Sequence, residues 1–351
     1  MAFESLTERE KQILFNLINY YVQSADPVGS RVIANKFQMG ISSATIRNTL
    51  SDLEDLGLVE QPHTSAGRIP TDLGYRVYVD YLLKPEELSQ TDKEIIRSTI
   101  LKEGRGVNEI LGQTCRLLGD ITHQLGVTIA PRFDEGRLRR LELIPLTDER
   151  IMVVVVVKSG MAKSVILEVE AAVEERALRE IEAVLNERLV DLTLGEIRRT
   201  VSERLADVRG QGRLVKLLVD SRDRIWTDRT PDDIKIAGLE NLVTQPEFAS
   251  LEKVSELMRL LENSYDLSQY LDLSPLAELV ITIGKENRFA DVMNCSLVTS
   301  SYKVGKISGT VGIIGPTRMP YSKLVSVVQY TARTISDALS GMDRDDTRKE
   351  E

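Results

Sequence analysis

The sequence predicts an α+β protein built from several domains. Stretches in which apolar residues recur every three or four positions indicate helices, and short runs rich in valine and isoleucine indicate strands. At ~100–200 residues per domain, a chain of 351 residues corresponds to two or three domains. Apolar residues make up 42% of the chain and charged residues 28%, so each domain has enough apolar material for a packed core.

Two helices are predicted at the N-terminal end. Thr7 and Glu10 have the spacing of a capping box, and apolar residues then recur at helical spacing. The segment 26–29 is a turn signal, after which Ser30 can cap a short second helix. Met39-Gly40 provides the next turn.

A third helix is predicted to begin at Ser42 or Ser43 and to stop at Gly57. Its buried stripe comprises Ile46, Leu50, Leu53 and Leu56. Its outer face carries hydroxyls, an amide and a guanidinium, from Thr45, Arg47, Asn48 and Ser51. Two short strands follow, 58–61 and 68–71, and the tip between them contains a glycine.

Three helices and a ribbon in this order are typical of a winged helix-turn-helix. Such a module reads base edges in the major groove with its third helix, and contacts phosphate or the minor groove with its wing. The pattern therefore predicts sequence-specific DNA binding. The candidate contacts are Arg31, Ser43, Thr45, Arg47, Asn48, His63, Thr64, Ser65, Gly67 and Arg68. A protein–protein module is the alternative, but the polar helix face and the wing together favour DNA.

The charge balance sets a condition on this prediction. The formal net charge is −9, and the first seventy residues contain eight acidic and six basic side chains. The acids gather at the start of the first helix and the end of the third, whereas Arg31, Arg47 and Arg68 lie on the predicted DNA side. We expect weak, salt-dependent non-specific binding, and a two-fold dimer for tight binding.

The later segments predict a GAF-like antiparallel sheet. The strand 127–130 is expected to pair with 234–237. A strand at 279–283, a hairpin over 295–314 that turns at Gly305, and a helix over 322–339 complete the GAF-like order.

Residues 136–229 interrupt that order and look self-sufficient. Three strands are predicted, followed by three helices, so we predict an inserted αβ domain. The alternative is that the three strands belong to the GAF-like sheet. The predicted bounds are 1–84 for the winged helix, 85–134 and 230–341 for the GAF-like domain, 135–229 for the insertion and 342–351 for a disordered tail.

The sequence predicts no enzyme, metal site or cofactor. Neither His63 nor His123 belongs to a catalytic or zinc-binding pattern, and the glycine-rich nucleotide motifs are absent. Cys115 and Cys295 have no CxxC spacing and are expected to be free thiols. With no signal peptide, and an apolar run at 151–157 too short to span a bilayer, we expect a cytoplasmic protein without membrane contact.

The loop before the last helix allows three interpretations. Thr317 and Arg318 precede a helix N-terminus, where anions bind well. The simplest interpretation is that Pro316 and Pro320 only shape the turn. The third is a contact between two GAF-like domains through Arg318 and Tyr321.

Two stretches resemble a known family. Residues 44–82, ATIRNTLSDLEDLGLVEQPHTSAGRIPTDLGYRVYVDYL, and residues 309–336, GTVGIIGPTRMPYSKLVSVVQYTARTIS, are similar to HrcA, the bacterial heat-inducible transcription repressors. The resemblance spans essentially the whole chain. It implies a homodimeric repressor of chaperone genes that dimerises through the inserted domain, binds an inverted-repeat (CIRCE-type) operator and is kept active by the GroEL chaperonin.

A metabolite-responsive regulator remains the alternative function, with the GAF-like domain as small-molecule receptor. Such a receptor needs convergent polar groups in a cavity. The C-terminal strands present mostly apolar residues, with few polar candidates beyond Tyr302 and Arg318. This favours a structural or interaction role for the domain.

Overall fold

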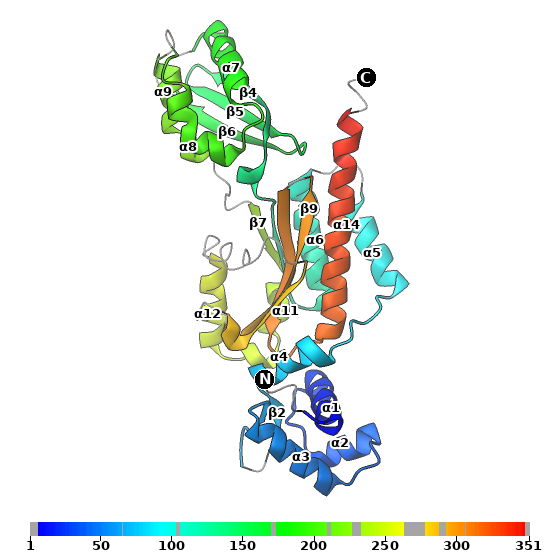
Figure 1. Cartoon of the computed structure of the whole chain (residues 1–351). Helices are drawn as coiled ribbons and strands as arrows, with labels where there is room; N and C mark the ends of the chain where they lie inside the picture. The colour runs from blue at the N-terminus through cyan, green and yellow to red at the C-terminus, as the bar shows by residue number, and fades with distance from the viewer. Residues whose placement is uncertain are drawn as a thin grey trace.

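The computed structural model describes residues 6–64, 66–102, 106–169, 173–208, 212–226, 233–262, 278–287, 293–305 and 307–347. Three parts lie in a row (Figure 1). We call residues 6–82 the head, the five-stranded sheet with its helices the body, and residues 136–226 the insert. The head and the insert lie at opposite ends of the body. In the described part of the chain, no helix has the length and apolarity needed to cross a membrane.

The head begins with the three predicted helices, α1 (Glu8–Ser24), α2 (Ser30–Phe37) and α3 (Ser43–Asp55). The capping box of Thr7 and Glu10 is confirmed. Ser30, in contrast, does not cap α2: Gly29 holds the N-cap position without a side-chain bond, and Ser30 is the buried first residue of the helix.

The buried stripe of α3 differs from the prediction at one position. Leu56 is 37% exposed, because α3 ends at Asp55 and Leu56 is already the C-cap residue. Thr49 lies on the buried face instead, and its hydroxyl donates to the carbonyl of Thr45 at 3.2 Å. Gly57, with φ +71°, adopts the left-handed conformation that ends the helix, as predicted.

The wing consists of β1 (Val59–Glu60) and β2 (Ile69–Pro70), which pair antiparallel. Val28 adds a third strand position, since its backbone exchanges hydrogen bonds of 2.8 and 2.9 Å with Arg68. The chain then forms α4 (Asp72–Val77) and a π-helical turn η1 (Tyr78–Leu82).

The body is built on one antiparallel sheet in the order β7-β3-β10-β9-β8. Its strands are β3 (Leu125–Ile129), β7 (Ile234–Ala237), β8 (Val280–Ile283), β9 (Cys295–Val304) and β10 (Ile307–Pro316). The predicted pairing of β3 with β7 is confirmed, with Gly126 opposite Ala237. Gly305, at φ +60°, turns the β9–β10 hairpin as predicted.

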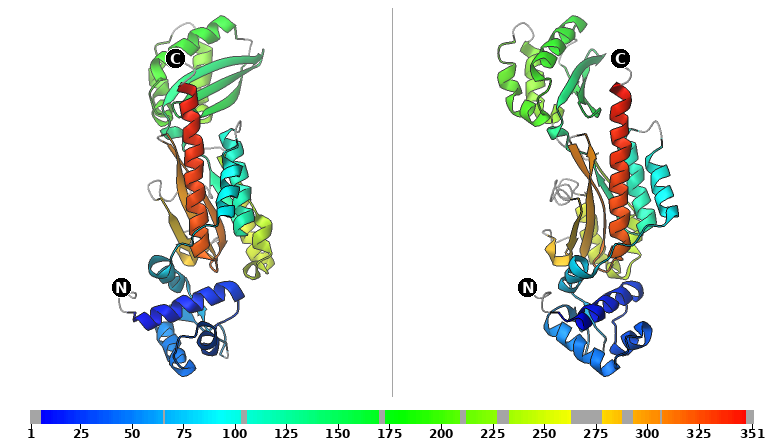
Figure 2. Two further views of the ribbon diagram at one scale, coloured as in Figure 1. Left: turned by 90° about the vertical axis from the view of Figure 1, so that its right-hand side faces the viewer. Right: turned by 45° about the vertical axis from the view of Figure 1, so that its right-hand side comes forward.

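Helices cover both faces of this sheet. On one face lie α6 (Val107–Thr122) and α14 (Tyr321–Thr347), with α5 (Gln90–Ile100) packed outside them (Figure 2). On the other lie α11 (Leu239–Val243), the 3₁₀ turn η4 (Pro246–Phe248) and α12 (Leu251–Glu262). The predicted disordered tail from residue 342 is wrong as far as Thr347, because a helix already formed extends by one backbone hydrogen bond per added residue.

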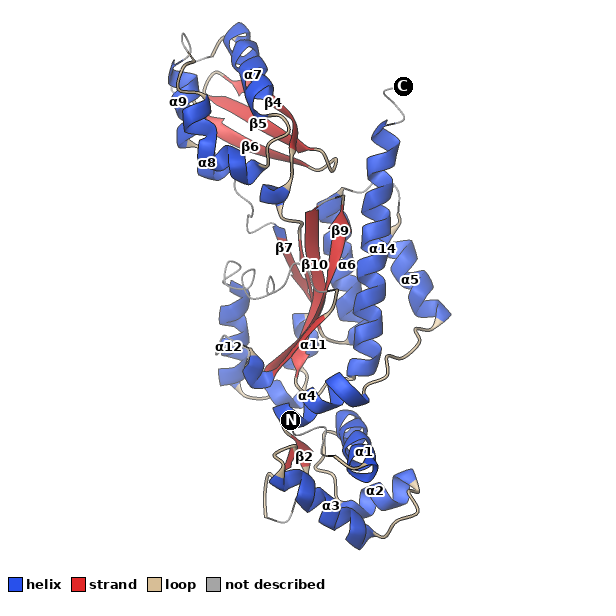
Figure 3. Cartoon of the chain, viewed as in Figure 1, coloured by secondary structure: helices blue, strands red, loops and turns tan. Residues whose placement is uncertain are grey.

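The insert follows a 3₁₀ turn, η2 (Phe133–Glu135), and has a sheet and a core of its own. Its elements are β4 (Leu138–Thr147), β5 (Arg150–Val157), β6 (Ala162–Glu168), α7 (Glu175–Leu189), α8 (Leu194–Arg204), α9 (Gly212–Asp220) and α10 (Arg222–Ile225). The strand order is β4-β5-β6, so the alternative that these strands join the body sheet is wrong. The helices lie on one face of the sheet (Figure 3). That face contributes Leu141, Val153 and Val155 to the buried core.

The core of the head and the body core on the α6 and α14 side of the sheet form one cluster, whereas the α12 side of the sheet and the insert each have a cluster of their own. The cluster includes Ile18, Tyr75 and Tyr78 from the head together with Ile283 and Tyr321 from the body. The head is therefore packed onto the body, and the linker after Leu82 is not its only attachment.

Candidate DNA-binding surface

The exposed face of α3 presents the polar side chains expected of a recognition helix. Arg47, Asn48 and Ser51 are exposed, and the helical repeat places them on one side. In the part of the chain that the structure describes, the side chains of Arg47 and Asn48 form no hydrogen bond or ion pair. A guanidinium and a neighbouring amide that are exposed on one helix face can bind guanine and adenine edges.

The first turn of α3 is fixed by its own polar residues. Ser42 is the N-cap, and its hydroxyl accepts a hydrogen bond from the backbone N–H of Thr45 at 3.1 Å. The Thr45 hydroxyl lies 2.9 Å from that of Ser42, and both Ser43 and Thr45 are half-buried. These two candidates are thus less accessible than Arg47, and Thr45 helps to set the start of the helix.

Arg31 lies in the first turn of α2 and is exposed. Among the described residues, none forms an ion pair with its guanidinium. Lys36, at the other end of α2, lies over the ring of Tyr20 at 4.5 Å from the centroid, a cation–π contact that orients the side chain.

The tip of the wing is held by a residue that the sequence did not single out. The amide of Gln61 donates to the carbonyls of Thr64 and Ala66, each at 3.0 Å. His63 and Thr64 are exposed at the tip, as expected, whereas Ser65 falls outside the described residues. A polar residue directly after a strand and before a turn was the available signal for Gln61.

Gly67 is required by packing. A β-carbon at this position would lie 2.4 Å from the carbonyl carbon of Val28, closer than atoms in real structures approach. Gly67 thus allows the wing to lie directly against the backbone that precedes α2. Its predicted part in DNA binding is therefore indirect, through the position of the wing.

Arg68 is engaged within the head. Its guanidinium forms an ion pair with Glu54 near the end of α3 at 2.6 Å, and the two side chains are 19% and 34% exposed. The pair joins the base of the wing to the recognition helix. This geometry favours a positioning role over the direct DNA contact that the sequence predicted.

The side chains of Arg318 and Tyr321, next to the start of α14, are engaged in contacts within the chain. Tyr321 is fully buried, and its hydroxyl donates to the carbonyl of Thr317 at 2.8 Å and accepts from Ser296 at 2.7 Å. The prediction that Tyr321 contacts a second copy of the domain is therefore wrong. Arg318 pairs with Glu247 at 2.5 and 3.1 Å and donates to the carbonyl of Val22 in α1 at 2.8 Å. Its guanidinium is thus already neutralised within the chain.

Other chemistry finds no support in the described part of the chain. No group of three or more His, Cys, Asp or Glu side chains is arranged there to hold a metal ion. Cys115 and Cys295 are free and buried, and burial raises the pKa of each thiol to about 12. Neither thiol is therefore a nucleophile at neutral pH.

The chain is similar to proteins of one family along its whole length. Residues 5–80 match the family model of the winged helix-turn-helix transcription repressor, HrcA DNA-binding, and residues 108–325 match that of the HrcA protein C terminal domain. The heat-inducible transcription repressor HrcA of Chlorobium phaeobacteroides (strain BS1) is 38% identical, covering 97% of this chain and 100% of that protein. Its counterpart in Chlorobaculum tepidum is 40% identical, covering 97% and 99%.

The fold is similar to that of a solved structure. The crystal structure of a hypothetical protein at 2.2 Å resolution covers 96% of this chain and 99% of its own, with a TM-score of 0.62 and 22% sequence identity.

Proposed function

Because the chain belongs to the HrcA family of heat-inducible transcription repressors, we propose that it represses chaperone genes by binding an inverted-repeat (CIRCE-type) operator as a homodimer. The family consists of repressors and not of enzymes. Each α3 would read one half-site, and the wing would contact the flanking phosphates. The observation that carries this proposal is the exposed pair Arg47 and Asn48 on the outer face of α3. The expected cytoplasmic location follows from the DNA partner.

Binding to defined DNA tests the reading of an inverted repeat. Duplexes from upstream of the chaperone genes would be footprinted with the full chain, and the protected sequence would then be offered as a repeat and as a single half-site. We expect protection of two half-sites related by two-fold symmetry, and binding to the repeat about 10²-fold or more tighter than to one half-site. Equal affinity for both probes would contradict the proposal.

We infer that the dimer forms through the outer face of the insert sheet, the face away from its helices. Ile144, Met152 and Ile166 are opposite one another on the three strands, so they form one apolar row across the sheet. Ile166 is 47% exposed, and none of the three belongs to a buried core. Because an isologous interface uses the same patch twice, an apolar sheet face can meet its own copy about a two-fold axis.

A charged side chain introduced into this apolar row tests whether the row forms the dimer interface. We expect Met152→Glu to sediment as a monomer and to bind the inverted repeat only as tightly as a single half-site. Ala183→Glu is the matched control, since Ala183 is an exposed residue of α7 on the helical side of the sheet. A Met152→Glu protein that remains dimeric and binds the repeat normally would place the interface elsewhere.

The last part of the proposal concerns how heat and the GroEL chaperonin regulate DNA binding. Heating would loosen the dimer or the packing of its parts and so release DNA, and the chaperonin would restore binding by refolding the chain. The support for this step is the family. Heat-treated protein should regain operator binding when incubated with GroEL, its co-chaperonin and ATP, and the same mixture without ATP is the control. Equal recovery without chaperonin would refute this step.

The alternative of a metabolite receptor loses its two polar candidates. The hydroxyl of Tyr302 is buried and donates to the carbonyl of Ile129 at 2.8 Å. Arg318 is paired with Glu247, as described above. Both groups are thus occupied by contacts within the chain, and neither observation favours a ligand.

A further inference from the structure

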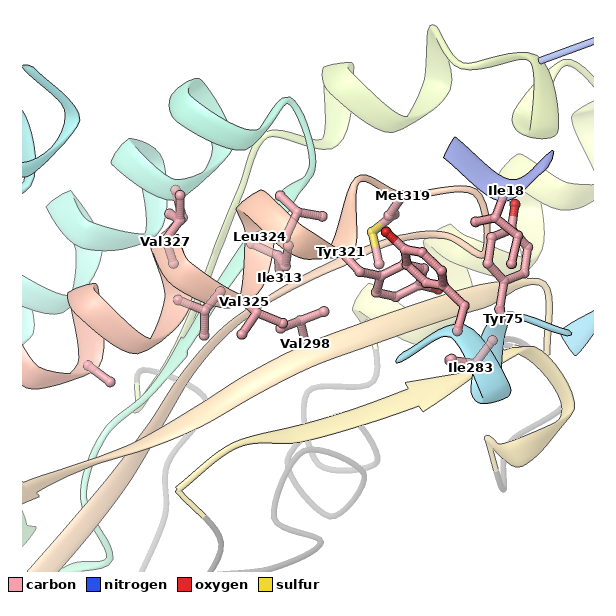
Figure 4. Packing of buried hydrophobic residues seen from close by; sticks show 14 of the residues in the cluster. Ile18, Tyr75, Ile283, Val298, Ile313, Met319, Tyr321, Leu324, Val325 and Val327 are labelled. Atoms are coloured by element: carbon pink, nitrogen blue, oxygen red, sulfur yellow. The ribbon is translucent and has the colours of Figure 1, made fainter. Parts of the chain in front are cut away.

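The contact between head and body contains a buried aromatic centre. Tyr75 of α4 is 2% exposed and lies against Tyr321 of the body, with ring centroids 5.9 Å apart. Ile18, Ile283 and Met319 surround the two rings (Figure 4). Burial raises the pKa of both phenols, so both rings are neutral at physiological pH. This centre holds the two parts together, but apolar packing alone has little directional preference.

The orientation of the head on the body is restrained by Arg76 of α4, whose guanidinium contacts residues of the body. Its Nε donates to Glu286 at 2.8 Å, and its Nη2 contacts the other carboxylate oxygen of Glu286 and the carbonyl of Ile281, the latter at 2.7 Å. Its Nη1 donates to Asp80 at 3.0 Å, within the head. Hydrogen bonding to Glu286 raises the pKa of Arg76. A planar guanidinium bound in this forked way tolerates little rotation.

Arg318 makes the reciprocal contact, from the body into the head. It donates to the carbonyl of Val22 in the last turn of α1, where helix carbonyls lack partners and a cation is favoured. The carboxylate of Glu247 holds the guanidinium in place, and the Arg318 side chain is only 14% exposed.

A third contact lies at the start of α4. The carboxylate of Asp72 accepts a hydrogen bond from the backbone N–H of Lys285 at 3.0 Å. This approach requires Gly284, where a β-carbon would lie 2.3 Å from the Asp72 carboxylate. Two of these contacts join α4 to the body segment Ile281–Glu286, and the third joins Arg318 to α1. Because they lie at two separate places, together they fix the orientation of the head as well as its attachment.

We propose that Arg76 and Arg318 are positioning residues that set the geometry in which two heads meet DNA, and so decide which half-site separations a dimer accepts. This inference rests on the proposed dimeric function. The insert lies at the far end of the body from the head (Figure 1), so a dimer formed there controls its heads only through the body and this joint. DNA turns once per ~10–10.5 bp, and a half-site moved by half a turn faces the opposite side of the duplex.

A spacer series tests the proposal in the full-length protein. Duplexes would carry the footprinted half-site as a single copy, and as inverted repeats with the natural separation or with about 5 or about 10 bp added. For the wild type we expect each longer repeat to lose most of the ~10²-fold or greater advantage that the second half-site provides. For Arg76→Gln we expect at least about a tenfold smaller penalty for the added half turn, with unchanged affinity for the single half-site.

Matched variants separate this role from general stability. Arg97→Gln removes the same charge from an exposed position of α5 and should keep the wild-type spacer profile. Glu286→Gln removes the same forked ion pair by changing its acidic partner, so it should reproduce the Arg76→Gln spacer profile. The double variant should differ little from either single variant. Arg318→Gln should broaden the profile independently. Melting temperatures would identify any variant that fails to fold, in which case Glu286→Gln carries the test.

The outcomes are distinguishable. If the folded Arg76→Gln, Glu286→Gln and Arg318→Gln proteins all keep the wild-type spacer profile, the joint does not select spacing and the inference is overturned. A wild type that accepts all separations equally also overturns it, because the heads are then not held. A wild type that gains nothing from a second half-site refutes the proposed dimeric function itself.

Discussion

The ion pair between Arg68 and Glu54 makes two roles for Arg68 experimentally separable. If Arg68 holds the wing against α3, Arg68→Ala and Glu54→Gln should both weaken operator binding. If Arg68 instead contacts phosphate, only Arg68→Ala should weaken it, and Glu54→Gln should strengthen it by removing a competing carboxylate. From the 2.6 Å contact and the partial burial of both groups, we expect the first result.

The size of the effect follows from the exposure of the pair. Fully exposed pairs contribute about 0–1 kcal/mol, and breaking fully buried pairs costs about 3–5 kcal/mol. With side chains 19% and 34% exposed, the pair between Arg68 and Glu54 should be worth about 1–2 kcal/mol. The backbone exchange between Val28 and Arg68 remains in either variant, so the wing should loosen without detaching. Binding should therefore weaken by about fivefold to thirtyfold.

Equilibrium binding at several salt concentrations is the assay, with Arg68→Ala, Glu54→Gln and the double variant. The double variant should be no weaker than Arg68→Ala alone, because both changes remove one interaction. The dependence of log K on log salt should keep its slope, since no phosphate contact is lost. A slope lower by about 1 for Arg68→Ala, together with tighter binding by Glu54→Gln, would refute the positioning role.

Three further changes have defined outcomes. Arg47→Ala should cost about 1–3 kcal/mol per half-site and reduce the ratio of specific to non-specific affinity, measured at one salt concentration; an unchanged ratio would argue against the α3 assignment. Gly67→Ala should lower the melting temperature and weaken all DNA binding, because its β-carbon cannot lie 2.4 Å from the carbonyl carbon of Val28; wild-type values for both would contradict this packing. Cys115 and Cys295 should resist iodoacetamide at about pH 8 while folded, because burial raises each pKa to about 12, and should react once heat opens the body; rapid labelling below the melting transition would contradict their burial.

The raised pKa of the buried thiols also predicts how the stability of the folded protein changes with pH. A thiol whose pKa is raised in the folded state favours folding below the pKa of the unfolded thiol, about 8.5. That contribution is lost as the pH rises from there toward about 12. The wild type should therefore lose more stability than the Cys115→Ala variant between about pH 8 and pH 10, measured by thermal melting. Parallel curves would show that folding does not raise the pKa of this thiol.

The local elements of the head could be predicted because their signals lie close together in the sequence. The two partners of the capping box, Thr7 and Glu10, are three positions apart, and Gly57 ends α3 within one turn. The same is true of the strands and helices of the insert, whose alternating or helical periodicities state which side of each element is buried. Pairing of β3 with β7 was also predictable, since the order of the surrounding elements left few possible partners.

Only the tertiary structure decided what the charged residues of the head bind. The sequence predicts that Arg68 contacts phosphate or the minor groove, whereas folding brings its guanidinium to the carboxylate of Glu54. Arg76 and Glu286 are 210 residues apart, and Arg318 meets a helix that lies 296 residues earlier in the chain. Periodicity in the sequence indicates which face of a helix or strand is buried. An ion pair between remote segments depends instead on how whole elements pack together, which periodicity does not indicate. The sequence by itself therefore determined which polar residues lie on the outer face of α3, and the packing of head on body determined how that face is oriented.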